Sequence, residues 1–76
     1  MKIVRVTWRD AWFDVDGDRR DWRAEYPVTT VGFLVRDTPE VLSVAAEQLP
    51  GDDGFRAITH IPQVTVLAFD VLWSSP

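Results

Sequence analysis

The sequence predicts a small all-β domain built from five strands. Two observations predict it: apolar and polar residues alternate in several stretches, and short turns rich in Pro, Gly and Asp separate those stretches. The 76 residues are enough for a single domain, which we place at 1–76. Because a chain of this length buries only about 60% of its unfolded surface on folding, we expect a partner to contribute to its stability.

The first strand is predicted over residues 2–8. Val4, Val6 and Trp8 alternate with polar residues, which is the pattern of a half-buried strand. Residues 9–27 then interleave charges of both signs with aromatic residues, and Asp16-Gly17 is a turn signal. We therefore expect a long loop after the first strand, and long loops in small domains are often functional.

The second strand is predicted over residues 28–36, where Val31, Phe33 and Val35 share one face. Gly32 lies inside this stretch. A glycine within a strand indicates a strong bend or the close approach of another backbone segment. In a small barrel, such a glycine is expected where the sheet curls.

Residues 38–49 allow two interpretations. Residues 38–40, Thr-Pro-Glu, have the composition of a helix start, and Leu42 and Ala45 follow at helical spacing. Read as a strand, Leu42 and Val44 share a face and the residues before them form a hairpin turn. We favour the strand, because a small sheet needs it to close and helix propensity is a weak guide. The alternative is an α+β fold with a helix at 38–49.

Two further strands complete the prediction. Residues 49–54 form a turn, residues 55–61 a strand, and residues 62–65 a tight corner that begins with a proline. The last strand, 66–73, is apolar on nearly both faces. An uncovered strand of this kind promotes aggregation, so we expect it to be covered within the barrel or by another subunit.

Composition excludes several classes of function. The net charge of −4 argues against bulk nucleic-acid binding, which depends on a basic surface. The chain has no cysteine and one histidine, so no thiolate or histidine-rich metal site is expected, and we predict no cofactor. Neither a signal peptide nor an apolar run long enough to span a bilayer is present, which predicts a cytoplasmic protein without membrane contact.

The long loop carries the candidate ligand-binding residues. Arginine pairs with phosphate or carboxylate through two hydrogen bonds, and tryptophan stacks on bases and cations. The candidates are Arg19, Arg20, Arg23, Trp12 and Trp22, and Tyr26 is a further aromatic residue of the same segment. They could bind a small anionic ligand such as a nucleotide, form a protein interface, or fold back to fill a small barrel.

Two other groups are weaker candidates. Asp14, Asp16 and Asp18 surround Gly17, but the glycine position does not match a calcium-binding loop and two arginines follow, so a solvated turn is the better interpretation. His60 and Asp70 could approach each other as an acid–base pair. No suitably spaced nucleophile accompanies them, so a structural hydrogen bond is favoured and no enzymatic activity is expected.

The stretch VGFLVRDT at 31–38, the element Trp8-Arg9-Asp10 and the Ile61-Pro62 corner carry a resemblance. The chain resembles a group of small proteins encoded by tailed bacteriophages. The order of its predicted strands is similar to that of SH3-like and Sm-like small β-barrels. In those folds, one helical turn precedes the last strand, which matches residues 61–64. The resemblance covers about two-thirds of the chain and carries no catalytic residue.

These observations lead to an expectation of non-enzymatic binding. The resemblance implies a phage accessory protein in the host bacterial cytoplasm, and phage proteins of this size include inhibitors of bacterial defence. The first hypothesis is sequestration of a small nucleotide-like signal. A protein–protein inhibitor of a host or defence protein and a structural phage component are the alternatives. We also expect a homo-oligomer formed through exposed strand edges.

Overall fold

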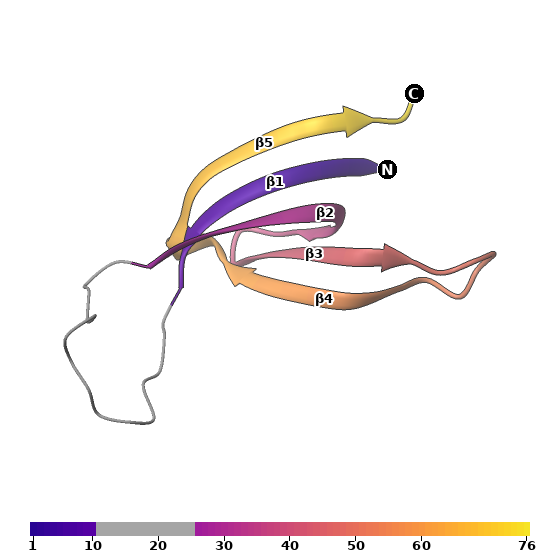
Figure 1. The fold of residues 1–76 in the computed structure, drawn as a ribbon, viewed down its shortest axis with the longest axis horizontal. Coiled ribbons are helices and arrows are strands. Elements are labelled where there is room, and N and C mark those ends of the chain that lie inside the picture. Colours follow the sequence, from indigo (N-terminus) through magenta and orange to yellow (C-terminus); the bar gives the residue numbers. More distant parts are fainter. Residues whose placement is uncertain (11–25) are drawn as a thin grey trace.

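The computed structural model describes residues 1–10 and 26–76. These residues form one sheet of five antiparallel strands in the order β4-β3-β2-β1-β5. The elements are β1 (Lys2–Arg9), β2 (Pro27–Asp37), β3 (Val41–Gln48), β4 (Phe55–Pro62), the 3₁₀ turn η1 (Gln63–Thr65) and β5 (Val66–Ser74). Figure 1 shows β4 and β5 at opposite margins of the bent sheet.

The all-β prediction is confirmed, whereas most of the loop predicted over residues 9–27 lies outside the described residues. Neighbouring strands follow one another from β1 to β4, and β5 pairs with β1. The 3₁₀ turn η1 before the last strand matches the tight corner predicted at residues 62–65. Within the described residues, no ladder joins β4 to β5, so the sheet has two edges and is not closed into a barrel.

The alternation in the first strand correctly predicts the core. Val4 and Val6 are fully buried and pack with Leu42, Val44 and Ile61. Three partly buried side chains surround this cluster: Trp8, Leu34 and Val66. Burial of such side chains is the main stabilising contribution in a chain that has no cysteine to form a disulfide.

Residues 41–48 form a strand, so the helical alternative for 38–49 is wrong. Thr38, which would cap a helix, instead closes the β2–β3 hairpin. Its Oγ1 accepts hydrogen bonds from the backbone N–H groups of Glu40 (3.3 Å) and Val41 (3.1 Å). The hydroxyl of a threonine before a proline can accept backbone N–H hydrogen bonds either at a tight turn or at the start of a helix, and here it does so at the turn.

Gly32 is required by close packing against β3. A Cβ atom at this position would overlap the backbone carbonyl oxygen of Ala45. This confirms the predicted close approach. The predicted alternation of this strand holds only in part, because a register shift interrupts the β2–β3 ladder between Leu34 and Arg36. Val31 pairs with Arg5 and is exposed rather than part of the core.

The predicted turns are also present. Gly51 and Gly54 have positive φ angles of 63° and 89°, which glycine adopts without strain. The backbone N–H of Leu49 donates to the carbonyl of Gly54 at 2.8 Å and closes the β3–β4 turn. Pro62 is the last residue of β4, and η1 follows it directly.

Candidate functional site

The five residues of the predicted ligand site lie outside the described residues. Arg19, Arg20, Arg23, Trp12 and Trp22 all belong to residues 11–25, so the anionic-ligand site stays a prediction. The structure does place the two ends of that segment side by side. Arg9 pairs with Pro27, and the backbone N–H of Asp10 donates to the carbonyl of Tyr26 at 3.0 Å.

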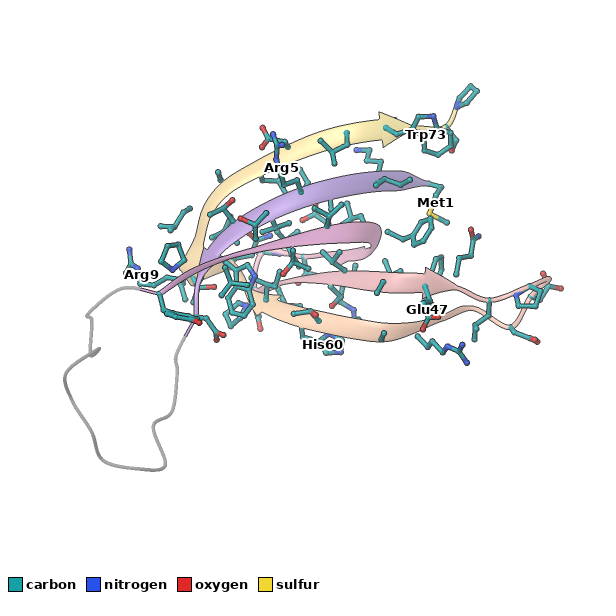
Figure 2. All side chains as sticks on the ribbon, in the orientation of Figure 1. Met1, Arg5, Arg9, Glu47, His60 and Trp73 are labelled. Atoms are coloured by element: carbon teal, nitrogen blue, oxygen red, sulfur yellow. The ribbon has the colours of Figure 1, made fainter. Side chains whose placement is uncertain are left out.

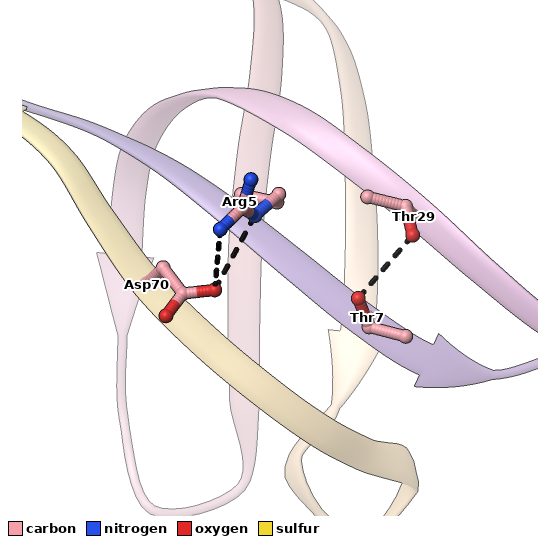
Figure 3. A network of polar contacts seen from close by, with 4 residues as sticks. All are labelled: Arg5, Thr7, Thr29 and Asp70. Atoms are coloured by element: carbon pink, nitrogen blue, oxygen red, sulfur yellow. Dashed lines mark hydrogen bonds and ion pairs between the residues drawn. The ribbon is translucent and has the colours of Figure 1, made fainter.

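The proposed contact between His60 and Asp70 is wrong. The two residues lie on β4 and β5, which form opposite edges of the sheet. Asp70 accepts hydrogen bonds from Nε and Nη2 of Arg5 at 3.3 and 3.2 Å (Figure 3). His60 instead lies opposite Ser43 on β3, and its Nδ1 is 2.7 Å from the Ser43 Oγ.

The Ser43–His60 pair resembles half of a nucleophilic site, but its surroundings favour a structural role. Ser43 is 1% exposed, so its Oγ cannot reach a substrate. His60 makes no other hydrogen bond in the described part of the chain that would orient it as a general base. The bond satisfies a buried hydroxyl on a strand that is covered on both faces. Sequence reasoning missed this pair because it depends on cross-strand register.

A cavity of about 270 Å³ lies where η1 meets the sheet and is lined by Asp37, Leu42, Gln63 and Phe69. Gln63 Nε2 donates to the Thr38 carbonyl at 3.0 Å and to Asp37 Oδ1 at 3.4 Å. These bonds hold η1 against the β2–β3 hairpin. Among the described residues that line it, Asp37 alone is charged, and its carboxylate would repel an anionic ligand.

The exposed edge strand β5 is the most distinctive surface feature of the described residues. Five of its large apolar side chains are between 39% and 51% exposed: Leu67, Phe69, Val71, Leu72 and Trp73. Of the two predicted ways of covering this strand, cover within its own barrel is wrong for the described residues, and cover by another subunit stays a prediction. Beyond the ladder with β1, no described strand pairs with β5.

The only charge on β5 is already neutralised. Asp70 is paired with Arg5 across the ladder, and Thr7 and Thr29 form a 3.2 Å hydrogen bond further along the same face (Figure 3). At the far end of β5, Trp73 pairs with Ile3 and lies near Met1 (Figure 2). The strand thus presents an apolar edge with a single compensated charge.

Other kinds of site find no support within residues 1–10 and 26–76. These residues contain no group of three or more side chains arranged to bind a metal ion. They also contain no helix long and apolar enough to cross a bilayer. Comparison with known proteins finds no matching family model, no matching curated protein and no matching solved structure. The case for function therefore comes from the exposed edge.

Proposed function

We propose that this protein is a non-enzymatic binding protein that recognises a protein partner by strand addition at β5. The observation that supports the proposal is that five apolar side chains of this edge strand, distributed over its two faces, are half exposed. Soluble monomeric proteins protect such edges, because unpaired N–H and C=O groups next to apolar side chains attract other strands. An edge of this composition is suited to a partner strand.

Backbone and side chains would contribute differently to this interaction. The outward N–H and C=O groups of β5 would extend the sheet by hydrogen bonds that any strand can form. The apolar side chains would supply most of the affinity and select an apolar partner strand. Asp70 is held by Arg5, so a partner does not have to provide a cation.

This function fits the second and third hypotheses from the sequence, an inhibitor of a host or defence protein and a structural phage component. Both need a protein-binding surface, and neither needs a small ligand. A phage origin and a place in the host bacterial cytoplasm belong to the proposal and are supported only by the sequence resemblance. Sequestration of a nucleotide-like signal depends on residues 11–25, which the exposed edge does not involve.

Site-specific photo-crosslinking in bacterial lysate tests the proposal. A benzophenone amino acid replaces Leu72, which has no direct partner on β1, or Val31, a control on the inner strand β2. The two side chains are 49% and 52% exposed, so their access to solvent is matched. We expect a discrete protein adduct at position 72 and none at position 31. Absence of an adduct at 72, or equal adducts at both positions, would contradict the proposal.

A further inference from the structure

The two edges of the sheet differ in how well they are protected. On β4, Pro62 lacks an N–H donor and Ala57 has a φ of 56°, which distorts the strand. Charges, prolines and distortions are the usual means of preventing edge-to-edge pairing. β4 therefore carries a proline and a distortion along eight residues, and its Arg56–Glu47 ion pair is matched by the Asp70–Arg5 pair on β5.

β5 has a short unprotected stretch. Two bulges leave Leu67 and Leu72 without direct partners on β1, and bulges also discourage pairing. Between them, residues 68–71 pair regularly with residues 4–7 of β1. This regular stretch contains Phe69 and Val71, and its one charge is compensated by Arg5. It is the part of the edge that another strand can extend.

We infer that the strand covering β5 is β5 of a second copy of this chain, paired antiparallel across a two-fold axis. The inference rests on the proposed function and names its partner. An isologous contact needs a self-complementary surface, and an apolar strand with a neutralised charge is self-complementary. The fully buried apolar side chains of the described residues number six, which is a small core for a domain that exposes five more on β5.

The register of the pairing follows from the faces of the strand and from Asp70. A two-fold axis perpendicular to the sheet places residues of the same face opposite each other. The axis then passes between the two copies of one residue, so that this residue lies directly opposite itself. An axis at Asp70 would place two carboxylates opposite each other, which is unfavourable. We assign the axis to Phe69, because Phe69 is the one aromatic residue of the regular stretch 68–71 and this axis places its two rings opposite each other, with Asp70 opposite Ala68.

Cysteine cross-linking measures this register directly, because the natural chain contains no cysteine. Phe69→Cys should form a covalent dimer on mild oxidation, since residues on the axis are directly opposite. Trp73→Cys serves as an exposed control on the same strand. Its two copies would lie about 26 Å apart at a rise of about 3.3 Å per residue, so no dimer should form. Covalent dimers at 73 but not at 69 would overturn the register.

The oligomeric state of the purified chain completes the test. Native mass spectrometry should show a dimer, and Phe69→Lys should raise the dissociation constant of this dimer by roughly ten-fold or more. Val31→Lys, on an inner strand, should leave the dimer intact. A monomeric natural chain, or a ring formed by β4 with β5, would overturn the inference. If the chain is monomeric and a different protein is cross-linked at position 72, the two-fold pairing is overturned but the proposed function is still supported.

Discussion

β3 and β5 are both rich in apolar residues, and they have opposite environments. In β3, Leu42, Ser43, Val44 and Ala45 are all buried, including the polar serine. In β5, every residue after Val66 is exposed. β3 lies between β2 and β4, whereas β5 has one neighbour. Two neighbouring strands are not sufficient for burial, because β2 also lies between two strands and none of its residues is buried; β3 is buried because it has two neighbours and packs on the core.

This difference indicates that the two strands stabilise different states. β3 contributes to the fold of each chain, because its side chains meet the core on one face and β2 and β4 at both edges. β5 keeps most of its apolar surface available for a partner. Substitutions should therefore affect folding when they are made in β3 and association when they are made in β5.

The largest effect is expected from a matched pair of leucine truncations. Leu42→Ala should lower the free energy of unfolding by about 2–4 kcal/mol, because it leaves a cavity in the core. Leu72→Ala should change the unfolding of the dilute, single chain by less than about 0.5 kcal/mol, because that side chain is half exposed. Urea titration at low protein concentration measures both values. Equal destabilisation would show that β5 is part of the core.

An intermediate effect is expected from the buried hydroxyl on β3. Ser43→Ala removes the 2.7 Å hydrogen bond to His60 and should lower the free energy of unfolding by about 1 kcal/mol. Ser74→Ala, at an exposed position on β5, is the control and should have almost no effect. Thermal unfolding followed by circular dichroism measures the difference. If Ser43→Ala is as stable as the natural chain, the structural role assigned to the Ser43–His60 pair is contradicted.

The smallest effect on folding is expected from the ion pair on the β5 side. The Arg5 and Asp70 side chains are about half exposed, so Asp70→Asn should destabilise the chain by about 0.2–1 kcal/mol, with less effect at high salt. Asp52→Asn, in the β3–β4 turn, is a charge-matched control. A loss of several kcal/mol in Asp70→Asn would mean that the pair supports the fold rather than only neutralising the edge.

Local sequence patterns predict most of the strands because alternation and turn residues are local properties. Val4, Val6 and Gly32 have the environments that the pattern indicates. The strand at 41–48 could not be decided from propensity alone, because it depends on pairing with β2 and β4. The exposure of β5 depends on the order of the strands, which is also non-local.

The candidate sites show the same limit. The sequence singles out His60 and Asp70 correctly as polar residues among apolar ones. It cannot identify their partners, Ser43 and Arg5, because these contacts join strands that are distant in sequence. The ligand site proposed for residues 11–25 stays a prediction, and the exposure of the apolar strand β5 follows from its place at the edge of the sheet.

Amide hydrogen exchange at several protein concentrations tests the central claim most directly. If a second copy pairs with β5, the outward N–H groups of residues 66–74 should exchange more slowly as concentration rises. The N–H groups of β4, residues 55–62, should show no such change. Protection that rises at β5 alone would support the two-fold pairing. Protection that does not change with concentration at β5, or that rises equally at both edges, would contradict it.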